Sequence, residues 1–160
     1  SEKLRDETLH VLTPLYQNKN PLYNATLING INFICIDNST YQINKEQLAF
    51  FKNEIKKGYP IVLLMHIPIY TSFGIQSSMG NPNWGADIDN SYIIERRERW
   101  SKEGNTATTK KFYQLIMNTP DIIVLAGHIH TNSIEMEKKL IQLTTGLSRD
   151  GHYRIIEFTK

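Results

Sequence analysis

Two short apolar runs, each followed by histidine, constrain the fold of this chain more than any other feature. Residues 61–65 (IVLLM) lead into His66, and residues 121–126 (DIIVLA) lead into the tetrapeptide 127–130 (GHIH). Runs of this length that are apolar on both faces are typical of parallel strands covered by helices. Because ligands gather beyond the carboxyl ends of such strands, the pattern predicts an α/β fold in which the histidines converge.

His66, His128 and His130 are the candidate metal ligands. In extended backbone, side chains two positions apart point to the same side, so His128 and His130 are expected to face one point while Ile129 turns inward. Imidazole accepts Zn, Fe, Mn or Ni, so the metal is not specified. Taken alone, the three histidines fit a mononuclear zinc site with an open fourth position.

The bulk composition predicts one domain and excludes two classes of partner. The 160 residues, 40% of them hydrophobic, suffice for a single core. A net charge of +2, with acids interspersed among the bases, indicates no nucleic-acid surface. No apolar stretch approaches the ~20 residues of a membrane span. No signal-peptide pattern opens the chain, and because it begins at Ser1, not Met, its localisation stays open.

A β-hairpin is predicted near the start of the chain. Asn29-Gly30 separates the apolar run 25–28 from the run 31–37, and an Asn-Gly pair in this position is a strong hairpin signal. Cys35 is the only cysteine and lies in the second run. We expect it to be a buried small hydrophobe and not a nucleophile.

A first helix is predicted between the hairpin and the His66 strand. Asn44 followed by Gln47 matches a capping box, which predicts a helix over 44–57 with Gly58 as its stop.

A second helix is predicted over 106–118, with Phe112, Leu115 and Ile116 facing inward. It feeds the strand that leads to His128. Strand, helix, strand units of this kind place their strands parallel, with the helix on one face of the sheet.

The segment 71–105 is rich in Gly, Ser, Asn and Asp and is expected to form a long excursion beside the site. Its arginines, Arg96, Arg97 and Arg99, alternate with acids as on a solvated helix face, so they are not counted as substrate ligands.

Three short strands are predicted after His130, over 133–136, 140–145 and 152–158, with turn signals before the last. The expected fold is thus a mixed sheet with antiparallel closing strands.

The two histidine motifs resemble, in order, spacing and context, the last two motifs of the calcineurin-like metallophosphoesterases. The matching segments are 65–68 (MHIP) and 126–130 (AGHIH), and the resemblance covers about residues 25–159. It implies that this α/β chain is the C-terminal half of a four-layer α-β-β-α sandwich.

The resemblance also implies a metal-dependent hydrolase of phosphate mono- or diesters. By it, His66 and His128 would bind one divalent ion of a pair, His130 would bind the other, and Gly127 would let the backbone turn close under the ions. An activated hydroxide would attack the phosphorus in line.

The upstream motifs of that family have no counterpart in the sequence. They are a D-x-H pair, a G-D-x-x-D segment with a bridging aspartate, and a G-N-H-[DE] segment with the catalytic histidine. The nearest match to the G-N-H-[DE] motif, residues 80–82 (GNP), lacks the histidine and follows His66 in the sequence. Residues 1–160 are therefore predicted to be a single partial domain that supplies metal ligands and no catalytic histidine.

Electrostatics indicates what the loss of those acids does. Two unit charges at ~4 Å interact by about 4 kcal/mol at an effective dielectric of 20, and two dications repel roughly four times as strongly. Neutral imidazoles do not offset this, so we expect at most one ion and no activity from the chain alone.

The missing upstream half is expected to be a partner, together with the phosphate-ester substrate. Its loss is expected to uncover an apolar sheet face formed by 31–36, 61–65 and 122–126, which favours self-association.

Two other functions stay open. One is a non-catalytic binding scaffold of the same fold. The other is a mononuclear zinc hydrolase, which needs a general base near the three histidines. Asp37 ends a strand and is the candidate base, although such aspartates are more often turn formers. His10 and His152 are expected to be structural or exposed, and Tyr70 fits packing as well as pocket lining.

Overall fold

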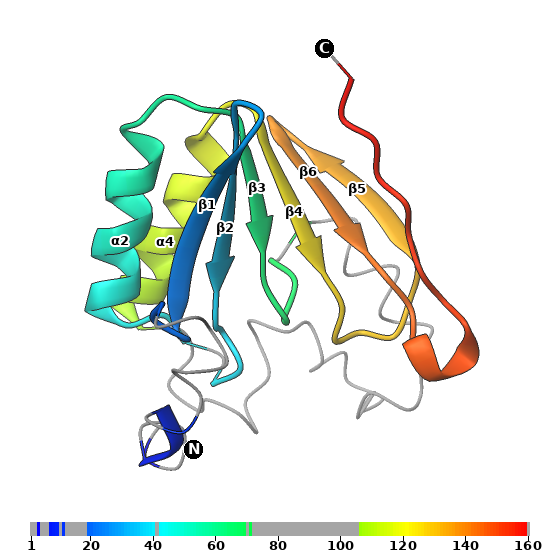
Figure 1. Ribbon diagram of the computed structural model, residues 1–160, viewed down its shortest axis with the longest axis horizontal. Helices are drawn as coiled ribbons and strands as arrows, with labels where there is room; N and C mark the ends of the chain where they lie inside the picture. The colour runs from blue at the N-terminus through cyan, green and yellow to red at the C-terminus, as the bar shows by residue number, and fades with distance from the viewer. Residues whose placement is uncertain are drawn as a thin grey trace.

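A computed structural model describes residues 19–40, 42–69, 71 and 106–159, together with residues 3, 7–9 and 11. These segments form an α/β fold in which two helices cover one face of a six-stranded mixed sheet (Figure 1). Neither of these two helices is long and apolar enough to cross a membrane. The expectations for residues 72–105, Tyr70 and His10 lie outside the described residues.

The sheet has the strand order β1-β2-β3-β4-β6-β5. Its strands are β1 Tyr23–Ile28, β2 Ile31–Ile36, β3 Ile61–Leu64, β4 Ile122–Ala126, β5 Ser133–Glu137 and β6 Leu140–Thr144. The four central strands run parallel, and β1 and β5 pair antiparallel at the two edges. The predicted parallel centre is confirmed. The closing strands are antiparallel to each other, but β6 joins the sheet parallel to β4.

The β1–β2 hairpin forms where the sequence predicts it. Asn29 and Gly30 connect the strands with φ angles of +50° and +84°. Two consecutive left-handed residues are what a two-residue turn needs to match the twist of its strands, and Asn-Gly adopts them at low cost.

Helix α2, Lys45–Ile55, begins at the predicted capping box. The Asn44 side chain accepts from the Gln47 backbone N–H, and the Gln47 side chain accepts from the Asn44 N–H. The Nε2 of Gln47 also donates to the backbone oxygens of Leu22 (3.1 Å) and Asp37 (2.6 Å). The helix ends before the predicted residue 57, and Gly58 follows at a φ of +73°.

Helix α4, Ala107–Asn118, is capped by the Thr106 side chain and buries Phe112, Ile116 and Met117. The inward prediction is confirmed for Phe112 and Ile116, whereas Leu115 is only partly buried. The Phe112 ring packs on Phe51 of α2 with ring centroids 4.8 Å apart.

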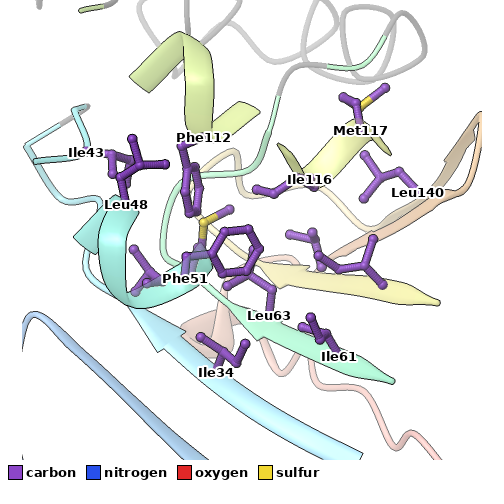
Figure 2. Packing of buried hydrophobic residues seen from close by; sticks show 14 residues of the cluster. Ile34, Ile43, Leu48, Phe51, Ile61, Leu63, Phe112, Ile116, Met117 and Leu140 are labelled. Atoms are coloured by element: carbon purple, nitrogen blue, oxygen red, sulfur yellow. The ribbon is translucent and has the colours of Figure 1, made fainter. Parts of the chain in front are cut away.

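The core lies between these helices and one face of the sheet (Figure 2). Ile34, Leu63 and Val124, one from each of three neighbouring strands, are fully buried there. Because alternate residues of a strand point to opposite faces, their sequence neighbours lie on the other side of the sheet.

The other side of the sheet, which we call the open face, is apolar but less covered. Phe33, Cys35, Leu64 and Leu125 are half-buried on it, as are Ile31, Ile123, Ile141 and Leu143, while Val62 is fully buried. The Phe158 ring meets Phe33 edge-on, with centroids 5.9 Å apart. The six-stranded sheet is the only one in the described segments, so the second sheet of the predicted four-layer sandwich is not seen there.

The strand predicted over 152–158 is not formed. Gly151, at a φ of +83°, ends a 3-10 turn, η4 Ser148–Asp150, and the chain then runs without strand pairing. Within the described part of the chain, residues 153–159 make no backbone hydrogen bond. The pattern of these residues is strand-like, but β5 occupies the free side of β6, and Phe158 instead contacts Phe33 on the open face.

Candidate metal centre

The ends of β3 and β4 bring His66 and His128 together. These neighbouring strands are parallel, and their ladder continues past Leu64 and Leu125: the Gly127 N–H donates to the His66 carbonyl at 3.1 Å. The loops that follow therefore run side by side. The Nε2 of His66 lies 3.1 Å from the Nδ1 of His128, with ring centroids 4.9 Å apart and planes at 74°. The predicted convergence is confirmed for this pair.

The separation of the two nitrogens fits a shared metal ion. Two nitrogen ligands at ~2.0–2.1 Å from a tetrahedral zinc are roughly 3.3 Å apart, and the observed separation is close to that value. Two imidazole nitrogens at this distance can share a proton, and with both nitrogens unprotonated they can bind one cation. The His66–His128 pair is therefore the strongest candidate for metal binding in the described residues.

His130 does not complete a three-ligand cluster. No group of three His, Cys, Asp or Glu side chains among the described residues could hold a metal ion. His130 is exposed, yet partial burial, followed by the nearby positive charge of Arg149, lowers its pKa; Asp150 acts in the opposite direction and His66 adds to the lowering. His130 thus lies within electrostatic range of His66 but outside its ligand pair.

The backbone of the histidine loop is left-handed, which corrects the prediction of extended backbone. His128 has a φ of +62° and His130 a φ of +55°. Each such non-glycine residue costs roughly 1–2 kcal/mol. Ile129 between them is 3% exposed and donates its N–H to the Gly127 carbonyl at 2.6 Å. Ile129 therefore turns inward as predicted, and its burial helps to hold a strained geometry of the kind that clusters at functional sites.

Gly127 has no conformational need for glycine. Its φ is not positive, and a Cβ added there would meet no atom closer than the Thr145 carbonyl oxygen at 4.0 Å. The role that the resemblance gives to Gly127 stays a prediction, because the described residues around it leave room for a side chain.

Asp37 acts as a turn former. Its Oδ1 accepts from the Ser39 backbone N–H at 2.9 Å, directly after β2. Asp37 also lines, with Cys35, Leu64 and His66, a hollow of about 500 Å³ on the open face. Asp37 therefore lines the same hollow as His66, and its Oδ1 takes part in a turn.

His152 is exposed and structural, as expected. The Asn132 Oδ1 accepts from the Gly146 backbone N–H at 2.9 Å, which fixes the orientation of that amide. Its Nδ2 must then donate to the Nδ1 of His152, 2.9 Å away. The ring also packs against Gly146, where an added Cβ would come within 2.8 Å of it.

Asn38 contacts the His66 loop, a role that was not predicted from the sequence. Its Oδ1 accepts from the backbone N–H groups of His66 (3.2 Å) and Ile67 (3.0 Å), and its Nδ2 donates to the Ile67 carbonyl at 2.7 Å. The sequence signal that could have indicated this contact is an amide side chain directly after the end of a strand.

Gln142 holds the same loop further along and was also missed. It is buried on β6; its Oε1 accepts from the Ile69 N–H at 2.6 Å, and its Nε2 donates to the Ile69 carbonyl at 2.9 Å. The buried Glu135 accepts from the same Nε2 (2.9 Å) and from the Thr71 hydroxyl (2.5 Å). A polar residue at an inward position of an apolar strand was the signal that could have found it.

Comparison of the sequence with models of known protein families finds no match, and neither does a search of curated proteins. The resemblance to the metallophosphoesterases therefore rests on the two histidine motifs.

Proposed function

We propose that this chain is the histidine-bearing part of a metal-dependent phosphoesterase. The observation that carries the proposal is the 3.1 Å approach of the His66 and His128 nitrogens at the ends of adjacent parallel strands. The proposal assigns these two rings to one divalent ion and His130 to a second.

The chain's own groups would bind and orient the phosphoryl group. Divalent ions at such a site polarise phosphoryl oxygens and make water a nucleophile at neutral pH. His66 and His128 would supply nitrogen donors, and Arg149, whose charge lowers the pKa of His130, supplies positive charge beside His130. Arg149 is largely exposed and paired with Asp150 at 3.3 Å, so it can reach an anionic substrate at modest cost.

The proposal requires carboxylates that the described residues do not place beside the pair. The His66–His128 pair gains no third ligand there, so it is expected to hold one ion weakly. We propose that a further β-layer supplies these acids and covers the open face. A phosphate ester and that layer are thus the proposed partners.

A non-catalytic binding scaffold is the second candidate, because the open face offers a broad apolar surface. The two functions differ in what the histidines do. If the pair binds no metal, the scaffold function is favoured over the phosphoesterase.

Zinc titration calorimetry tests the proposal. At pH 8 the 160-residue chain should bind one zinc ion, and His128→Ala should abolish the binding. His152→Ala is the matched control, since His152 is an exposed imidazole that contacts Asn132 and lies outside the pair. Equal binding by wild type and His128→Ala would refute the assignment.

The affinity should fall at lower pH, because imidazole must be neutral to act as a ligand and its ordinary pKa is about 6.5. With two ligands, about a hundredfold loss is expected between pH 8 and pH 5.5. Turnover of an aryl phosphate by the chain alone should stay near background. Robust metal-dependent turnover that His128→Ala removes would show that no further layer is needed.

A further inference from the structure

Asn38 takes over the position of a neighbouring strand where β2 ends. The last β2–β3 pair joins Cys35 to Leu64, and β2 stops at Ile36. Past this point the β3 chain would present unpaired peptide groups on its β2 side. The Asn38 side chain fills the gap, since its amide offers the same acceptor and donor as a peptide group.

The His66 loop is thereby held on both sides. On one side, Asn38 accepts from the N–H groups of His66 and Ile67 and donates to the Ile67 carbonyl. On the other, the His66 carbonyl accepts from the Gly127 N–H of the β4 chain. Both peptide groups that flank the His66 Cα are therefore bonded, which fixes the direction of its Cα–Cβ bond and so the region that its ring can reach.

This restraint matters because the His66 side chain itself is exposed. Apart from its contact with the His128 ring, few described groups restrict the His66 ring, so its orientation depends strongly on the backbone. We propose that Asn38 is a positioning residue of the metal centre: it holds the His66 backbone so that the imidazole nitrogen meets that of His128. The metal-binding part of this inference rests on the proposed function.

Gln142 has a different task, although it also holds this loop. It binds Ile69, after Pro68, and is tied to the buried Glu135. Its contacts therefore anchor the exit of the loop in the protein interior and are separated from His66 by a proline. The peptide groups next to His66 are bonded by Asn38 alone among side chains of the described residues.

The test compares Asn38→Ala with Asn32→Ala in the full 160-residue chain. Asn32 lies at the other end of β2, is buried, and donates to the Glu54 carboxylate at 2.9 Å. Its loss should therefore destabilise the fold without touching His66. Asn38→Asp is the second variant, which serves if Asn38→Ala does not fold: it retains the two accepting contacts and replaces the donated one with repulsion between its second oxygen and the Ile67 carbonyl.

Two readouts separate this inference from the proposed function. The first is the nuclear Overhauser contact between the His66 and His128 rings in metal-free protein, which their 4.9 Å centroid separation makes observable. The second is zinc affinity by calorimetry, where the loss of a residue that orients a ligand typically costs about 10- to 100-fold.

We expect Asn38→Ala to lose the ring contact and to bind zinc at least about tenfold more weakly. Asn32→Ala should keep both, and Asn38→Asp should keep the ring contact. A ring contact retained in Asn38→Ala would overturn the inference, whatever the affinity. If wild type binds no zinc, the proposed function fails, and the ring contact alone then decides the role of Asn38.

Discussion

The two faces of the sheet are both apolar, but the described residues close only one of them. On the helix-covered face Ile34, Leu63 and Val124 are fully buried under α2 and α4. On the open face Phe33 and Leu125 are half-buried, and the edge-strand residues Ile134 and Met136 are 60% and 63% exposed. Because side chains alternate along the same strands, one face of the sheet forms a fully buried core and the other forms an apolar surface that is only partly buried.

The difference in burial between the two faces shows on which side of the sheet the described residues form a core. A helix-covered parallel strand is apolar on both faces because both are meant to be covered. Large exposed apolar areas on a monomer generally mark sites of contact with other protein. Among the described residues, the helix-covered side thus holds the buried core, and the open face is the side on which we propose a further layer.

The largest effect should come from deleting matched aromatic rings on the two faces. Phe51→Ala removes a fully buried ring from the core and should lower the free energy of unfolding by about 3–5 kcal/mol. Phe33→Ala removes a half-buried ring from the open face and should cost only about 1–2 kcal/mol. Urea denaturation measures both. Equal losses would mean that the open face is packed as tightly as the core.

The second-largest effect should be self-association of the chain through the open face. We expect the chain to associate at micromolar concentration in sedimentation experiments, because each large apolar side chain newly buried contributes about 1.5–3 kcal/mol. Leu143→Lys places a charge on this face and should weaken association about tenfold or more. Tyr59→Lys, at an exposed site outside the strands, is the control. A monomeric wild type that unfolds cooperatively would show that the open face is covered within the 160 residues.

The alkylation rate of Cys35 should measure how well its thiol is shielded from solvent on the open face. Burial raises the pKa of this thiol, partly offset by Lys19, so less thiolate is present at pH 8 than in an unfolded chain. Alkylation by iodoacetamide should accordingly be slower in the folded protein and should keep rising with pH beyond the range of a free cysteine. The same reaction in urea gives the reference rate. If folding does not slow alkylation at pH 8, the thiol is not shielded.

The smallest effect should come from the outer edge of the open face. Ile134→Thr and Met136→Thr replace largely exposed side chains on β5 with a residue that suits strands, so stability should change by no more than ~0.5 kcal/mol. Urea denaturation with matched slopes checks this. A loss well above that value would show that residues outside the described segments cover β5.

The elements that were predicted correctly are those whose signals are local. Asn29-Gly30 sets the hairpin through its own φ angles, and Asn44 with Gln47 starts α2 through contacts three residues apart. The meeting of His66 and His128 is longer in range, but it follows from the rule that adjacent parallel strands align their carboxyl ends.

What the sequence did not predict depends on contacts between distant segments. The left-handed His128 and His130 are held by the burial of Ile129, which no local pattern announces. Asn38 reaches a loop 28 residues away, and Gln142 reaches one 73 residues away. The strand predicted over 152–158 has a suitable local pattern, but its residues pair with no strand of the described sheet, and Phe158 contacts Phe33 instead.

The parallel pairing of β3 with β4 has a consequence for the order of folding. The β1–β2 hairpin closes a loop of two residues, whereas β3 and β4 must meet across the whole intervening chain, since His66 and His128 are 62 positions apart. Closing such a loop loses entropy before any contact compensates for it, so pairings of this kind form slowly. We therefore expect the hairpin to gain protection from hydrogen exchange early in refolding. The two imidazoles should come into contact only with the final cooperative step, so a metal ion added during refolding would stabilise the product without guiding the early chain.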